Sequence, residues 1–117
     1  WGPQARGFIQ DFGKEFAHII LQGHHTQGES HIAMGQQLRA ESWRMVANPA
    51  TSRNLIDAKQ NGAAVLSRRH LQTCAWSRAQ RGSAHGPGWG KGQDWCTTTW
   101  IIPGLTVIIG SVYLLML

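Results

Sequence analysis

Four histidines lie close together in the sequence, and their side chains are of the type that binds metals. They are His18, His24, His25 and His31, with Glu15 and Glu29 nearby. Imidazole is a common ligand of zinc and of haem iron. However, no two of these histidines have the i, i+4 spacing of a helical ligand pair, and adjacent residues point in different directions. We interpret the segment as a solvated polar loop and expect no metal and no other cofactor; His24, His25 and His31 are the weak metal candidates.

A glycine-rich segment around Lys91 superficially resembles a phosphate-binding loop. That loop requires Gly, four residues, Gly, Lys and then Ser or Thr. Here His85 stands at the first glycine position, and Gly92 follows Lys91. The Ser and Cys residues also show no local pattern that pairs a nucleophile with a base. We therefore expect no enzymatic activity.

Positive charge is concentrated in the second half of the chain, where residues 58–93 include six basic residues and no acidic ones. Such a stretch can be a solvated face, can attract anionic lipid headgroups by about 1 kcal/mol per cation, or can bind RNA. Because an apolar segment follows it, we expect contact with lipids such as cardiolipin and no nucleic acid. The expected lipid-contact residues are Arg68, Arg69, Arg78, Arg81, Lys91, Trp95 and Trp100.

Apolar residues near the start of the chain indicate a second contact surface. They are Phe8, Phe12, Phe16, Ile19 and Ile20. Their spacing of three to four residues is that of one face of a helix. Because the chain is poor in apolar residues, we expect this stripe to dock on a partner protein.

The C-terminal part of the chain is strongly apolar. From Trp100 to Leu117, 13 of 18 residues are hydrophobic and none is charged. With Thr97–Thr99 included, a helix would be about 31 Å long, which matches the roughly 30 Å hydrocarbon core of a bilayer. The pattern predicts a transmembrane helix over 97–117, with the basic residues before it on the matrix side.

The preceding part, residues 1–95, is expected to be extended and partly helical. Its patterns predict helices at about 4–22, 32–47 and 52–77 and a glycine-rich linker at 81–94. Only 15 of the first 99 residues are Leu, Ile, Val or Phe, whereas a chain with less than roughly 20% of them struggles to build a core. The predicted fold class is mostly α, with a single C-terminal transmembrane helix after a polar segment that has no independent core.

The first residue and the absence of glycosylation acceptors bear on the compartment. The chain begins with Trp1 and has no Asn-x-Ser/Thr sequence, which favours a cleaved mitochondrial transit peptide over the secretory route. We expect a single-pass protein of the mitochondrial inner membrane, with its N-terminus in the matrix and its C-terminus in the intermembrane space.

This architecture is similar to that of accessory subunits of respiratory complexes and of ATP synthase. It favours a non-catalytic structural subunit of a respiratory electron-transport complex. The expected partners are the other subunits and anionic phospholipids such as cardiolipin. An ATP synthase accessory subunit, a thylakoid photosystem small subunit and a membrane-anchored assembly factor or adaptor are the alternatives.

Overall fold

The structure is a computed structural model of the chain, in which residues 1–52, 59–60, 62–77 and 93–114 are described. Two α-helices, a short 3-10 helix and eight strands follow one another in the described residues. They are α1 (Pro3–Phe12), η1 (Gly13–Glu15), β1 (His18–Gln22), α2 (Gly28–Ala40), β2 (Trp43–Ala47), β3 (Thr51–Ser52), β4 (Lys59–Gln60), β5 (Ala63–Arg68), β6 (Thr73–Ser77), β7 (Gln93–Ile102) and β8 (Leu105–Leu114).

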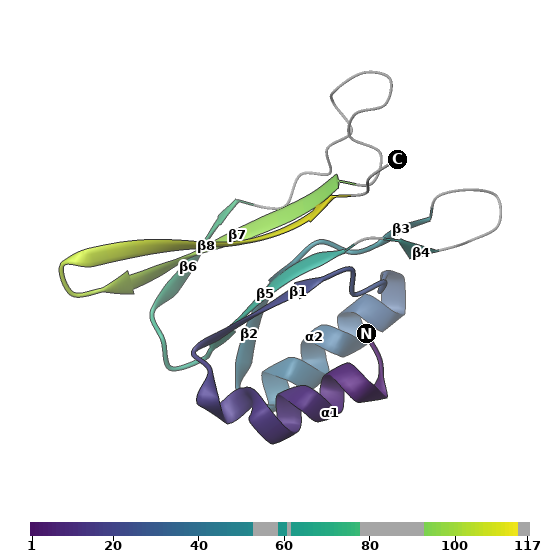
Figure 1. Ribbon diagram of the computed structural model, residues 1–117, viewed down its shortest axis with the longest axis horizontal. Helices are drawn as coiled ribbons and strands as arrows, with labels where there is room; N and C mark the ends of the chain where they lie inside the picture. Colours follow the sequence, from purple (N-terminus) through teal and green to yellow (C-terminus); the bar gives the residue numbers. More distant parts are fainter. Residues whose placement is uncertain (53–58, 61, 78–92, 115–117) are drawn as a thin grey trace, which may run out of the picture.

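The main elements form three layers (Figure 1). The central sheet is antiparallel, with strand order β1-β5-β2. Helices α1 and α2 cover one of its faces, and the outer sheet, with order β6-β7-β8, packs against the other. Strands β3 and β4 form a separate pair.

Strand β5 is the middle strand of the central sheet, and its side chains alternate between two apolar cores. Leu66 points towards the helices, whereas Ala63 and Val65 point towards the outer sheet. All three are fully buried. A strand that is covered on both faces has a continuous apolar sequence, as residues 63–66 do. The helix-side core contains Ile9, Met34, Leu38, Trp43 and Leu66, and the inter-sheet core contains Ala63, Val65 and Cys96 with Val46 and Ile109 packed against them.

The three predicted helices are replaced in part or completely by strands. The first, 4–22, ends at Phe12 and continues through η1 into β1. The second, 32–47, is α2 only as far as Ala40, and the chain then enters β2. In the third, 52–77, the described residues form β5 and β6 together with the ends of the β3–β4 pair. Most of the predicted linker at 81–94 lies outside the described residues. Cross-strand pairing to β5 therefore outweighs the helical periodicity at both β1 and β2.

The predicted transmembrane helix is also wrong, because residues 97–114 belong to β7 and β8. These strands pair continuously from Gln93 with Leu114 to Ile102 with Leu105. Pro103 and Gly104 form the connecting turn, in which Gly104 has a φ of +77°; a proline followed by a left-handed glycine is typical of such turns. The segment is rich in Thr, Val and Ile, whose branched side chains favour strands.

The membrane placement fails with that helix. None of the helices in the described residues is long and apolar enough to cross a membrane. The predictions of a mostly α fold and of a single-pass protein of the mitochondrial inner membrane, with its N-terminus in the matrix, are therefore wrong. The mitochondrial inner-membrane and respiratory-chain assignments fail with that helix, and so does the transit peptide that was inferred from Trp1 and the missing glycosylation acceptors. The role of a non-catalytic structural subunit is not tested by the fold and stays a prediction.

The prediction that the segment before the apolar run has no core of its own fails for a related reason. Counting only Leu, Ile, Val and Phe omitted residues that this fold buries, among them Trp43, Met34 and Ala63, each at most 2% exposed. In addition, the apolar C-terminal strands contribute Ile109 to the inter-sheet core. The C-terminal segment therefore completes the hydrophobic core of the preceding residues.

Candidate anion-binding site

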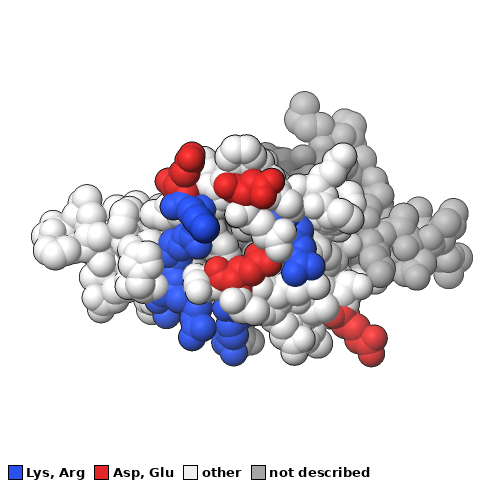
Figure 2. Space-filling model, turned by 90° about the horizontal axis from the view of Figure 1, so that it is seen from below, with Lys and Arg blue, Asp and Glu red and all other residues white. Residues whose placement is uncertain are grey.

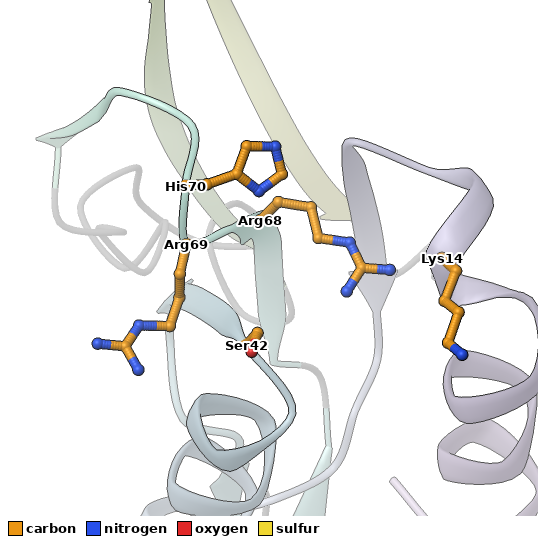
Figure 3. A pocket seen from close by; sticks show the side chains of 5 residues that line it. All are labelled: Lys14, Ser42, Arg68, Arg69 and His70. Atoms are coloured by element: carbon orange, nitrogen blue, oxygen red, sulfur yellow. The ribbon is translucent and has the colours of Figure 1, made fainter.

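An open hollow at one end of the central sheet collects basic side chains. It has a volume of about 650 Å³ and is lined by Lys14, Ser42, Arg68, Arg69 and His70 (Figure 3). We call it the basic cleft. Three of its five residues carry a permanent positive charge, so an anion is the ligand that it favours electrostatically.

Three segments that are distant in the sequence position these side chains. Arg68 is the last residue of β5, and Arg69 and His70 form the turn that follows it. Lys14 comes from η1, at the end of α1. Ser42 lies between α2 and β2 with a φ of +69°, and its carbonyl oxygen accepts a hydrogen bond from the Arg69 amide at 3.0 Å. This hydrogen bond joins the turn after β5 to the segment after α2.

Arg68 is the most firmly held cation of the cleft. Its Nε donates to the Phe16 carbonyl oxygen at 3.4 Å. The centre of its guanidinium lies 3.9 Å from the ring centroid of Trp43, a distance typical of a cation–π contact. Trp43 is itself buried, so its ring is a fixed support. Arg68 therefore presents its remaining N–H groups in a defined orientation, which lowers the entropy cost of binding a phosphate or carboxylate.

A second hollow adjoins the first. Its volume is about 280 Å³, and Arg39 of α2 and Arg44 of β2 are among its lining residues, as is Arg69. Arg69 thus lines both hollows. In Figure 3 the side chains of Arg68 and Arg69 leave the turn in opposite directions, Arg68 towards η1 and Arg69 away from it.

These cations form a continuous feature of the surface, which we call the basic track. It consists of Lys14, Arg39, Arg44, Arg68 and Arg69. Seen from the helix side, Lys and Arg side chains gather in a band on one part of the molecule (Figure 2). A track that extends over two hollows is longer than a single small anion needs.

The basic track has little internal charge compensation. Among the described residues the one ion pair joins Arg6 Nη2 and Glu41 Oε1 at 3.5 Å. The same carboxylate oxygen accepts a hydrogen bond from Gln10 Nε2 at 2.8 Å. Glu41 lines a smaller hollow beside Lys14 and Arg68, but it lies beyond 4 Å of their charged nitrogens. Unpaired like charges destabilise a folded chain, so their concentration here indicates a binding role.

The residues predicted to contact lipid have different locations. Arg68 and Arg69 lie in the basic cleft. Trp95 and Trp100 are half-buried on β7, where Trp100 packs edge-on against His18 with centroids 4.7 Å apart. Arg78, Arg81 and Lys91 lie outside the described residues.

Sequence reasoning missed Lys14, Arg39, Ser42, Arg44 and His70. The available signal was the Arg68-Arg69-His70 run directly after a continuous apolar strand, since a strand that ends in cations places them together at a sheet edge.

The weak metal candidates do not form a metal site. Across the described part of the chain, no group of three or more His, Cys, Asp or Glu side chains could hold a metal ion. His24 is buried; its Nε2–H donates to the Asn48 carbonyl oxygen at 2.6 Å, and its Nδ1 accepts from the Thr26 amide at 3.1 Å. Burial lowers the pKa of His24 to about 4. His31 lies beside it, with ring centroids 5.4 Å apart, and His25 is exposed. His24 is therefore a neutral structural residue.

A Ser–His pair also lies within the described residues. His18 Nδ1 and Ser67 Oγ are hydrogen-bonded at 2.8 Å across β1 and β5, and burial lowers the pKa of His18. Ser67 is only 2% exposed. A nucleophile that solvent and substrate do not reach has no catalytic use, so we interpret the pair as a cross-strand contact.

The predicted docking residues divide between surface and core. Phe8, Phe12, Phe16 and Ile20 are each between 44% and 51% exposed. Ile19 is partly buried against the helix-side core. The exposed rings leave apolar surface available for a partner, which remains a prediction.

Comparison with protein-family models, with curated proteins and with solved structures gave no match.

Proposed function

We propose that this chain is a non-catalytic module that binds nucleic acid through the phosphate backbone, and that the basic track is its contact surface. Binding of this kind is electrostatic and independent of base sequence, because Arg and Lys contacts to phosphates position a nucleic acid without reading it.

One observation carries the proposal. Five cations line two adjoining hollows, and none of them has a carboxylate partner within 4 Å among the described residues. A polymer of phosphates supplies successive negative charges, which a track of this extent can contact together. The net charge of the whole chain is +5 at pH 7, so long-range attraction to a polyanion acts in the same direction.

A membrane surface offers phosphates as well, and the sequence alone predicts contact with anionic lipids. That expectation depended on an apolar segment inserted in lipid beside the basic residues, and β7 and β8 occupy that segment in a sheet. What is left is a row of cations along two adjoining hollows that are open to solvent, and a chain of phosphates can follow such a row.

The test measures fluorescence anisotropy of a labelled 20-nucleotide oligomer titrated with the full chain between 50 and 300 mM salt. The variants are Lys14→Gln and Arg68→Gln. We expect each variant to bind about five- to tenfold more weakly and to lower the salt slope by about one. The expected losses are of the size that removal of one phosphate contact causes.

Arg6→Gln is the matched control, because it makes the same change in net charge but removes a cation that is paired with Glu41. We expect its affinity to stay within twofold of the parent chain. Equal losses in all three variants would mean that only net charge matters, which would contradict a defined site. Binding to vesicles that contain 30% anionic lipid, without binding to the oligomer, would replace nucleic acid by a membrane surface and overturn the proposal.

A further inference from the structure

Phe16 is an exposed aromatic residue whose backbone contacts Arg68, the most firmly held cation of the basic cleft. Its side chain is 44% exposed, and its carbonyl oxygen accepts the hydrogen bond from Arg68 Nε. Its backbone is extended, and its amide donates to the Gly13 carbonyl oxygen at 3.1 Å. The backbone that carries this ring is thus fixed at both its amide and its carbonyl group, within a side-chain length of the Arg68 guanidinium.

The other two exposed phenylalanines have a different environment. Phe8 and Phe12 pack on each other on α1, with ring centroids 5.2 Å apart. On the helix they lie on the flank opposite Arg6 and Gln10, the two residues that contact Glu41. Phe16, in contrast, makes no ring–ring contact within the described part of the chain. The Phe16 side chain is not among the residues that line the basic cleft, but its exposed ring belongs to the residue whose carbonyl group holds Arg68, so a base that adjoins a phosphate on Arg68 can reach it.

The arrangement of the cations bears on the kind of nucleic acid. The two hollows of the basic track meet at Arg69, and Arg68 and Arg69 point in opposite directions from one turn (Figure 3). A stiff duplex, with a persistence length of about 150 base pairs, does not bend around a single turn of the chain. A flexible single strand can follow such a path, and its unpaired bases are free to stack on aromatic side chains.

We infer that the basic cleft binds single-stranded nucleic acid in preference to duplex, and that a base stacks on Phe16 while Arg68 holds the adjoining phosphate. This inference rests on the proposed function and adds to it the ligand class and the specificity-determining residue. Phosphate contact supplies attraction to any polyanion, and stacking supplies the preference for a strand with exposed bases.

The test compares three labelled probes on the full chain: oligo(dT) of 15 nucleotides, a 15-base-pair duplex, and an abasic oligomer of the same length. The variants are Phe16→Ala and Phe16→Tyr, with Phe8→Ala on α1 as the matched control.

We expect Phe16→Ala to bind oligo(dT) about tenfold more weakly, which is the effect of losing one stacked base. Phe16→Tyr and Phe8→Ala should remain within twofold, and the abasic oligomer should bind parent and Phe16→Ala equally. The thermal unfolding midpoint of each variant, measured by circular dichroism, shows whether it is folded under the binding conditions.

The outcomes separate this inference from the proposed function. If Phe16→Ala leaves oligo(dT) binding unchanged, or weakens the abasic oligomer equally, stacking is refuted; the basic track stands if Arg68→Gln still loses affinity. Tighter binding of the duplex than of oligo(dT) would also refute it. If the parent chain binds none of the three probes, both proposals fail. A larger loss with Phe8→Ala than with Phe16→Ala would move the aromatic contact to α1 and overturn the assignment of Phe16.

Discussion

Polar groups at the two ends of the central sheet have opposite environments, buried and hydrogen-bonded at one end and open to solvent at the other. At one end, after β1 and before β5, His24 is buried and each of its ring nitrogens is hydrogen-bonded. At the other end, where β5 finishes, Arg68 and its neighbours Lys14 and Arg69 line an open hollow and have no carboxylate partner within 4 Å among the described residues. Both ends belong to the same strands, so the difference arises from the segments that cover each end.

The two ends are expected to have different roles, folding stability at the His24 end and ligand binding at the Arg68 end. A buried polar group with all its hydrogen bonds satisfied makes one arrangement of the chain favourable and leaves nothing for a ligand. Cations without a carboxylate partner keep their charge available for an external anion, even where the ring of Trp43 and the Phe16 carbonyl group orient Arg68. We therefore expect changes at the His24 end to alter unfolding, and changes at the Arg68 end to alter binding.

The largest expected effect is on stability at the His24 end. A Cβ added at Gly62 would lie 2.4 Å from the nearest atom of the His24 ring, and Gly62 has a φ of +91°. Gly62→Ala should therefore lower the free energy of unfolding by about 3–5 kcal/mol, from overpacking together with left-handed backbone strain. Urea denaturation followed by circular dichroism measures this. The matched control is Gly104→Ala, which has φ +77° and open space around it; it should cost only about 1–2 kcal/mol. Equal losses would show that the His24 packing is not tight.

The next largest effect is acid destabilisation through His24. Burial lowers its pKa to about 4 in the folded chain, against roughly 6.5 when unfolded. The unfolded chain therefore takes up the proton first, so stability is complete above pH 6.5 and falls as the pH drops towards 4. The expected loss is about 3 kcal/mol over that window, measured as urea midpoints at several pH values. His24→Gln should be less stable at pH 7 and should flatten this slope; an unchanged slope would assign the effect to another group.

A smaller effect should distinguish the two arginines of the cleft. Arg68 is fixed by Trp43 and by the Phe16 carbonyl group, whereas Arg69 is exposed. Arg68→Lys keeps the charge but loses the planar fork, so oligo(dT) affinity should fall about three- to fivefold. Arg69→Lys should remain within twofold. The comparison uses the same anisotropy titration, and equal behaviour of the two variants would show that Arg68 acts only as a point charge.

The smallest effect concerns the stability cost of the cleft. Arg69→Gln removes one of several neighbouring like charges, whose repulsion is worth a few tenths of a kcal/mol. The unfolding midpoint should therefore rise by about 1–2 °C at low salt while oligomer affinity falls. Differential scanning calorimetry at 20 mM and 500 mM salt measures the change, which should vanish at high salt. A lower midpoint would mean that Arg69 stabilises the turn.

Parts of the fold and of the site could be predicted from local sequence. A helix does begin near residue 4, and Phe8 and Phe12 lie exposed on it. Arg68 and Arg69 were predicted as lipid contacts, a prediction that no observation tests, because they lie in a stretch with no acidic residues before an apolar segment; the sequence thus indicated the positive charge that the structure places in the basic cleft. Lys14 and Ser42 could not be assigned to that surface, since they reach it only through the chain reversals between α1 and β1 and between α2 and β2.

By itself, the sequence determined where apolar residues and positive charge accumulate. Only the tertiary structure decided that the apolar run 100–114 forms a strand pair with one covered face, on which Ile109 packs in the inter-sheet core, while Leu105 and Ile108 stay exposed. Hydropathy could not predict this, because it measures the gain from leaving water and does not specify the surroundings that replace it. The tertiary structure likewise decided that Lys14 and Arg68 face one hollow, since convergence of distant charges depends on how the chain turns back.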